Sequence, residues 1–156
     1  MSGFTFKQFK VEHDSCAMKV STDGILLGAW AYLKGANTLL DIGTGTGLLA
    51  LMCKQRQPAL SITAVEIDEA AYKQAQQNIA SSPWPNITVK HTTIQAFKQA
   101  APFDVVISNP PYFNRSLKGL SDARNTARHT DGLSFDELIH AYMRLSHEYS
   151  CFNVIL

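Results

Sequence analysis

Short apolar runs alternate along this chain with longer segments in which apolar residues recur every three or four positions. Four runs rich in Val, Ile, Leu and Thr have the length of buried strands and span residues 38–42, 61–67, 87–91 and 103–108. The helical pattern covers residues 47–56, 69–80, 94–99 and 134–147, and a fifth strand is expected to begin at residue 151. This alternation predicts an α/β fold built on a mainly parallel sheet.

Two segments lie outside the alternation. Ahead of the sheet, residues 4–11 suggest an extended or hairpin segment and residues 23–33 an apolar helix. Between the fourth and fifth strands, residues 110–132 form a long loop. A loop of this length inside a compact domain is uncommon unless it is functional or disordered, so we expect a lid or a substrate contact there.

The composition limits what the protein can be. A chain of 156 residues with 46% hydrophobic residues can bury one core, so we expect a single domain over residues 1–156, with a cap segment at 1–36 and a core at 37–156. No apolar run approaches a membrane span and the N-terminus lacks a signal-peptide run, which predicts a cytoplasmic protein. Three cysteines and five scattered histidines have no metal-ligand spacing, so no metal is expected. A net charge of +1 argues against broad nucleic-acid binding but leaves room for a local basic patch.

The first strand leads into a glycine-rich turn, Asp41-Ile42-Gly43-Thr44-Gly45-Thr46-Gly47. Glycines at such a turn let the backbone approach a ligand closely. Glu66, at the end of the second strand, is placed to hydrogen-bond both ribose hydroxyls of an adenosine. Leu48 occupies the third-glycine position of the dinucleotide fingerprint, so no pyrophosphate-binding pattern is present. These features favour S-adenosylmethionine over NAD as the cofactor, and a purely structural turn is the alternative.

The fourth strand ends in Asn109-Pro110-Pro111-Tyr112, a sequence suited to an amino group on a flat ring. The Asn109 side-chain oxygen and the Pro110 carbonyl can accept both hydrogens of that amino group, which frees its lone pair for attack. Tyr112 can stack on the ring. These residues do not distinguish adenine from cytosine or from a glutamine amide, and an ordinary strand-to-loop turn is the structural alternative.

Taken together, these motifs resemble the class I methyltransferases, and Asn109 to Tyr112 matches the motif of the amino-group methyltransferases. The segments 6–11 and 18–30, together with Arg128-His129, resemble the bacterial valine-tRNA adenine-N6 methyltransferase family. The resemblance implies a Rossmann-like class I methyltransferase fold whose five strands lie in the order third, second, first, fourth, fifth. Family members continue through two further strands, so we expect a chain truncated before the last two strands and an exposed edge at the fifth.

The resemblance also implies roles for individual residues. Asp41, Gly43 and Gly45 would line the methionine part of S-adenosylmethionine, Glu66 the ribose and Ile67 the adenine. Many class I enzymes hold the adenine amino group with an acid after the third strand, where this chain has Thr93 and Ile94. Asn109 would contribute to both cofactor and acceptor. Thr22 would close the cofactor pocket, with a helix N-cap as the alternative.

The expected activity is methyl transfer to N6 of an adenine in the anticodon loop of a valine tRNA, beside the anticodon. A loop base can be splayed into a pocket at modest cost. Four cations against Asp122 give residues 113–129 a charge of +3, so we expect this loop to bind tRNA. The residues expected to contact RNA are Arg115, Lys118, Arg124, Arg128 and His129. The alternatives are a glutamine-N5 protein methyltransferase and a catalytically silent fragment that binds cofactor or RNA.

Overall fold

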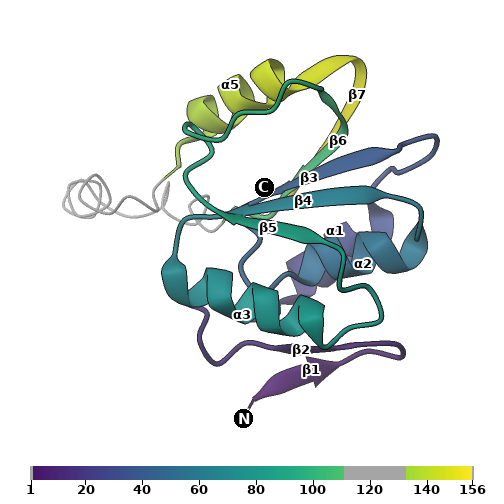
Figure 1. The fold of residues 1–156 in the computed structure, drawn as a ribbon, viewed down its shortest axis with the longest axis vertical. Coiled ribbons are helices and arrows are strands. Elements are labelled where there is room, and N and C mark those ends of the chain that lie inside the picture. The colour runs from purple at the N-terminus through teal and green to yellow at the C-terminus, as the bar shows by residue number, and fades with distance from the viewer. Residues whose placement is uncertain (1, 111–132, 156) are drawn as a thin grey trace, which may run out of the picture.

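A five-stranded parallel sheet forms the centre of the computed structural model, which describes residues 2–110 and 133–155. The strands lie in the order β5-β4-β3-β6-β7 (Figure 1), which confirms the predicted order. Their bounds are β3 (Thr38–Ile42), β4 (Ser61–Glu66), β5 (Thr88–His91), β6 (Phe103–Ser108) and β7 (Ser146–Val154). Because all five run parallel, their carboxyl ends meet at one edge, where α/β folds bind ligands.

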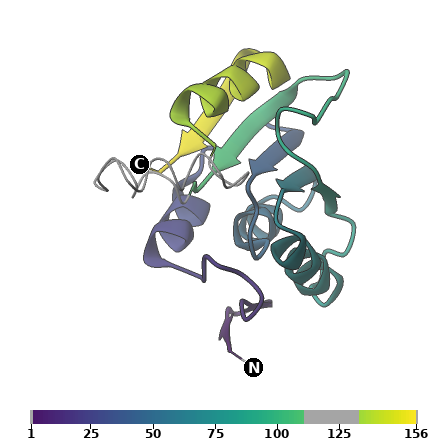
Figure 2. The same ribbon diagram turned by 90° about the vertical axis from the view of Figure 1, so that its left-hand side faces the viewer.

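Helices cover both faces of the sheet. In Figures 1 and 2, α1 (Thr22–Trp30), α2 (Leu48–Arg56) and α3 (Glu69–Ala80) lie on one face, and α5 (Phe135–Leu145) lies on the other. A small antiparallel hairpin, β1 (Gly3–Thr5) and β2 (Lys10–Glu12), packs outside α3. Among the helices in the described ranges, none is long and apolar enough to cross a membrane.

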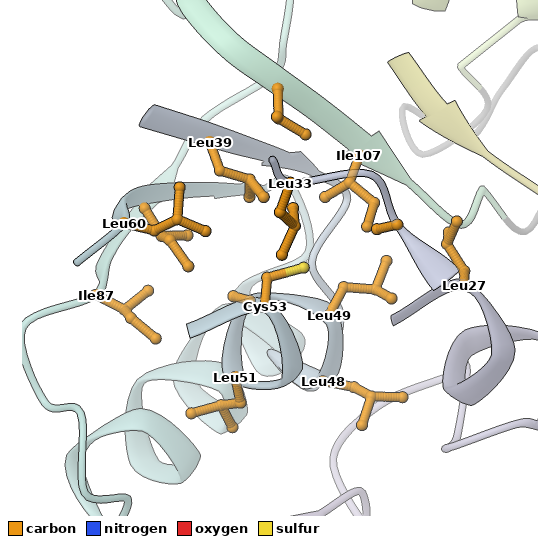
Figure 3. Packing of buried hydrophobic residues seen from close by; sticks show 14 of the residues in the cluster. Leu27, Leu33, Leu39, Leu48, Leu49, Leu51, Cys53, Leu60, Ile87 and Ile107 are labelled. Atoms are coloured by element: carbon orange, nitrogen blue, oxygen red, sulfur yellow. The ribbon is translucent and has the colours of Figure 1, made fainter. Parts of the chain in front are cut away.

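The core is divided into two clusters because side chains alternate between the faces of each strand. Leu39 and Ile107 point toward α1 and α2, where they pack with Leu49 and Cys53 (Figure 3), and Val105 belongs to the same cluster. On the opposite face, the neighbours of these strand residues pack with α5. That cluster includes Leu40, Val106, Phe103 and Leu138. The short, nearly continuous apolar runs at residues 38–42 and 103–108 are therefore strands buried on both faces.

The last strand is longer than predicted. Strand β7 begins at Ser146 and α5 ends at Leu145, so the prediction of a strand from 151 and a helix to 147 is wrong at this junction. The first residues of β7, 146–150, are polar and are held by a side chain. The Ser150 hydroxyl donates to the Phe103 carbonyl of β6 (2.6 Å) and accepts the His147 amide (2.9 Å). These bonds hold an irregular register that the sequence pattern does not reveal.

The predicted helix at 94–99 is also wrong, because residues 94–96 form a turn and residues 97–99 have no regular secondary structure. Ile94 and Phe97 are buried, as a helical face would be. Their carbonyls, however, accept hydrogen bonds from the Arg144 guanidinium of α5 at 2.7 and 2.8 Å. A side chain from a distant helix thus takes the place of further helical turns.

Helix α1 begins at Thr22, one residue before the start expected from the sequence. Ser21, not Thr22, is the N-cap of α1, and its hydroxyl accepts the Gly24 amide at 3.2 Å. The helix then ends at Trp30 rather than at residue 33. The N-cap interpretation of Thr22 is therefore wrong, since Thr22 is already the first helical residue.

Candidate functional site

A cavity of about 180 Å³ opens at the carboxyl ends of β3, β4 and β5. The glycine turn lines it with Gly43 and Gly45, and β4 contributes Val65 and Glu66. Parallel pairing brings these ends together, with Ile42 beside Val65 and Glu66 beside His91. The sheet therefore gathers residues from separate parts of the sequence around one hollow, as the sequence predicted.

The glycine turn has a backbone that other residues rarely adopt. Gly43, Gly45 and Gly47 have φ values of +70°, +56° and +86°. A Cβ added to Gly43 or Gly45 would meet no atom within 4 Å, whereas at Gly47 it would lie 3.7 Å from Ala75 of α3. The first two glycines thus face empty space, and a ligand can approach their backbone directly.

Glu66 holds the glycine turn with its carboxylate. One oxygen accepts the Gly45 amide at 2.8 Å and the other accepts the Asp68 amide at 3.0 Å. The residue is only 8% exposed and lines the cavity. Because a carboxylate oxygen can accept more than one hydrogen bond, each oxygen keeps capacity for a hydroxyl of a ligand. Position and chemistry thus suit two ribose hydroxyls.

Asp41 lies beneath the turn instead of facing the cavity. It is fully buried, and one of its oxygens accepts the Thr44 hydroxyl at 2.7 Å. The other oxygen has no hydrogen-bond partner among the described residues. Burial raises the pKa of this carboxyl to about 7, against the smaller opposing effect of the Thr44 hydrogen bond. Asp41 lines neither cavity described here, so its contact with the methionine part stays a prediction.

A second, smaller cavity of about 30 Å³ adjoins the first. Both are lined by Met18, Gly43 and Gly45. The smaller one reaches Asn109, just beyond β6, and Pro110 lines the larger one. The Asn-Pro pair therefore borders the same composite hollow as the glycine turn.

Asn109 follows an anchored residue and lies next to α1. The preceding residue, Ser108, is fully buried and donates its hydroxyl to the Ile42 carbonyl at 2.8 Å. On the other side, a Cβ on Gly24 would lie 3.1 Å from Leu48 and 3.4 Å from the Asn109 amide nitrogen. Helix α1 consequently packs directly against the carboxamide. Tyr112 falls outside the described residues, as do the cations expected to contact RNA, Arg115, Lys118, Arg124, Arg128 and His129.

The larger cavity is also lined by the three residues expected near the adenine. Ile67, Thr93 and Ile94 all line it. The Thr93 hydroxyl already accepts the Ala96 amide at 3.1 Å. Thr22 lines neither cavity and is exposed, so its role at the cofactor stays a prediction.

Residues 13–21, which we term the strap, form a wall that sequence reasoning missed. Cys16, Ala17 and Met18 line the larger cavity. Burial raises the pKa of the Cys16 thiol to about 11, so this side chain is a neutral wall and not a nucleophile. The strap has no periodic pattern, so only contacts of the folded chain could have identified it.

Two buried amides of α3 tether the strap and the strand before it. The Asn78 oxygen accepts the Glu12 amide at 3.0 Å, and its nitrogen donates to the Glu12 and Thr46 carbonyls, both at 2.8 Å. Gln74 accepts the Ser15 amide at 3.4 Å. Asn78 therefore joins the cap hairpin to the glycine turn. Within the described residues, no group of His, Cys, Asp and Glu is arranged to hold a metal ion.

Comparison with protein families gives a match to the model described as "Methyltransferase small domain", over residues 25–126. A "tRNA1(Val) (adenine(37)-N6)-methyltransferase" of Pseudoalteromonas translucida is 73% identical over 156 residues, and one of Phocaeicola vulgatus is 54% identical over 154 residues. The matches cover 100% and 98% of this chain but 67% and 65% of those proteins. The chain thus spans about two thirds of the length of these relatives.

Solved structures share the fold at low sequence identity. YjhP of Escherichia coli superposes with a TM-score of 0.64 at 11% identity, covering 92% of this chain and 50% of that one. A methyltransferase from Thiobacillus denitrificans in complex with S-adenosyl-L-homocysteine gives a TM-score of 0.62 at 12% identity, with the same coverage. These neighbours confirm the Rossmann-like class I methyltransferase fold.

Proposed function

The chain belongs to the methyltransferase small domain family, and from this premise we propose that it transfers a methyl group from S-adenosylmethionine to N6 of an adenine in tRNA. The finer assignment is the adenine beside the anticodon of a valine tRNA. It is supported by the names of relatives 73% and 54% identical to this chain. Because the chain spans about two thirds of their length, the activity of the whole protein is part of the proposal.

The observation that carries the proposal is the composite hollow at the sheet edge. Its larger part contains Glu66, its smaller part contains Asn109, and Gly43 and Gly45 line both. A donor cofactor and an acceptor amino group must meet in one place for group transfer. The composite hollow meets this requirement, because the Glu66 carboxylate can bind the ribose in its larger part and the Asn109 carboxamide borders its smaller part.

The residues present fit S-adenosylmethionine. Glu66 would hold the ribose. The empty space beside Gly43 and Gly45 would let the cofactor approach the backbone of the glycine turn, and Ile67 and Ile94 would pack on the adenine. When bound, the cofactor supplies an electrophilic methyl group. The chain itself positions the acceptor.

Asn109 and Pro110 carry the acceptor chemistry in this proposal. Asn109 directly follows Ser108, whose hydroxyl is hydrogen-bonded to a carbonyl of β3, and its carboxamide lies next to α1. Together with the Pro110 carbonyl, the carboxamide oxygen would accept the two N–H groups of the exocyclic nitrogen. Such acceptors stabilise the positive charge that develops as the nitrogen is methylated. Tyr112 would stack on the base, and the cations of residues 113–129 would contact the RNA backbone.

Nucleoside mass spectrometry tests the proposal. The protein is incubated with methyl-labelled S-adenosylmethionine and, separately, with valine tRNA, other tRNAs and protein substrates. We expect label in N6-methyladenosine from valine tRNA. Label only on cytosine, or only on a protein glutamine, would contradict the assignment while leaving a methyltransferase. The proposal includes tRNA as the partner, which the relatives' names support, and a cytoplasmic location, where a tRNA substrate would be met.

A further inference from the structure

The strap brings one cation to the smaller cavity. Lys19 lines this cavity together with Ser21, Thr44, Thr46 and Asn109. In the part of the chain that the structure describes, Lys19 is the only charged residue in its wall. An anionic group placed in this cavity would therefore find its counter-charge at Lys19.

The backbone that follows Lys19 is held by hydrogen bonds. The next amide, that of Val20, donates to His13 Nδ1 at 3.2 Å, and Ser21 caps α1 by accepting the Gly24 amide at 3.2 Å. Within the described ranges, the Lys19 ammonium has no ion-pair or hydrogen-bond partner. The strap thus holds the backbone next to Lys19 at the cavity, and the ammonium is available to a ligand.

The chemistry of the adjoining cavities decides which ligand group reaches Lys19. If Glu66 holds the ribose in the larger cavity, the amino-acid end of the cofactor would lie toward the smaller one, because Gly43 and Gly45 line both. That end has two charged groups, an ammonium and a carboxylate. The ammonium suits the carbonyl oxygens of the turn. The carboxylate requires a donor or a cation, which the strap supplies.

We propose that Lys19 binds the carboxylate of the methionine part of S-adenosylmethionine, which makes it a specificity residue for the amino-acid end of the cofactor. The inference rests on the proposed function, because it requires S-adenosylmethionine as the ligand. It extends that function by assigning the strap a direct contact, in addition to its role as a wall.

Binding of two ligands that differ in one group tests the inference. Decarboxylated S-adenosylmethionine keeps the adenosine, sulfonium and ammonium but lacks the carboxylate. By titration calorimetry, Lys19→Met should weaken S-adenosylmethionine binding about tenfold, the order expected for a hydrogen bond to a charged group. Binding of the decarboxylated ligand should change less than about twofold. Lys19→Arg should restore most of the affinity for S-adenosylmethionine.

Lys34→Met is the matched control, because Lys34 is an exposed lysine that lines neither cofactor cavity. It should leave both affinities unchanged. Equal weakening of both ligands by Lys19→Met would overturn the inference and indicate a structural role for the lysine. Unchanged S-adenosylmethionine affinity with weakened tRNA binding would also overturn it, in favour of a phosphate contact.

The proposed function fails by a different result. If the unaltered protein binds S-adenosylmethionine but methylates no tRNA, the proposed activity is wrong, while the two-ligand comparison still tests Lys19. If the unaltered protein does not bind S-adenosylmethionine, both are wrong.

Discussion

A carboxylate accepts two backbone amides at each end of the sheet, but only one of the two faces an empty space. At the carboxyl edge, Glu66 accepts the amides of Gly45 and Asp68 at 2.8 and 3.0 Å. At the amino edge, Asp104 accepts the amides of Asn37 and Thr38 at 2.7 and 3.2 Å. Both acids tie a connecting loop to a strand.

The surroundings of the two acids differ. The second oxygen of Asp104 is 2.8 Å from His147 Nε2, and this hydrogen bond holds the pKa of Asp104 below its usual range. Beside Glu66, the glycines leave a cavity. The comparison teaches that bonding to loop amides does not by itself indicate a binding site. The unfilled space next to the acid does.

The largest effect is expected at Asn109, on the open edge. Asn109→Ala should lower turnover by about 10²–10³, the range for removing one preorganised polar partner of a transition state. The affinity for S-adenosylmethionine should change much less than the turnover, because the contact of Asn109 with the acceptor nitrogen is the one that strengthens as charge develops in the transition state. Single-turnover methylation of valine tRNA measures the first quantity and calorimetry the second. Near-normal methylation by the variant would contradict the acceptor chemistry.

Asp41 and Asp104 should respond to pH with opposite signs. Burial raises the pKa of Asp41 to about 7, above its unfolded value, so its contribution to stability is fully present at low pH and is lost as the pH rises toward 7. The pKa of Asp104 is lowered, so its contribution is present above the ordinary range of an aspartate and is lost as the pH falls below that range.

Chemical denaturation of the unaltered protein and of Asp41→Asn, at about pH 5 and about pH 8, measures the first of these contributions. Relative to the variant, the unaltered protein should lose about 2–3 kcal/mol of unfolding free energy over this interval, since each pH unit is worth about 1.4 kcal/mol. Groups shared by both proteins cancel in the difference. Parallel pH profiles would show that Asp41 is ionised in the folded protein throughout.

Gly45 and Gly35 form a matched pair for the empty space. They have φ values of +56° and +76°, and a Cβ on either would meet no atom within 4 Å. Alanine should therefore cost about 1–2 kcal/mol of stability at both, through backbone strain alone. Only Gly45→Ala should also weaken S-adenosylmethionine binding, by about 1–3 kcal/mol, because its methyl group enters the cofactor cavity. Equal affinity of the two variants would argue against the cofactor at this turn.

The sequence predicts the carboxyl edge of the sheet, which has the cavity, better than the amino edge around Asp104. The glycine turn, Glu66 and Asn109 each follow directly after a recognisable buried strand, so parallel topology alone places them together. The contact between His147 and Asp104 joins residues 43 positions apart. It depends on the irregular start of β7, and no local pattern encodes it.

The sequence also does not reveal that Gln74 and Asn78 bond the backbone of the strap and cap hairpin, and the reason is similar. Gln74 and Asn78 occupy α3, where polar side chains ordinarily indicate a solvent-facing position. Here they are buried, because the cap hairpin and strap cover that face of the helix and supply backbone partners. Nothing in the local sequence of the helix specifies that partner.

The most direct test of the central claim removes each of the two acids, Glu66 and Asp104, in a separate variant. Calorimetric titration with S-adenosylmethionine and chemical denaturation are applied to Glu66→Ala and Asp104→Ala. Glu66→Ala should weaken cofactor binding by about 1–3 kcal/mol, since the acceptor of the ribose hydroxyls is lost. Asp104→Ala should leave the affinity within about twofold and lower the free energy of unfolding by about 1–3 kcal/mol. Unchanged affinity in Glu66→Ala, or an equal loss in both variants, would contradict a cofactor site at the open edge.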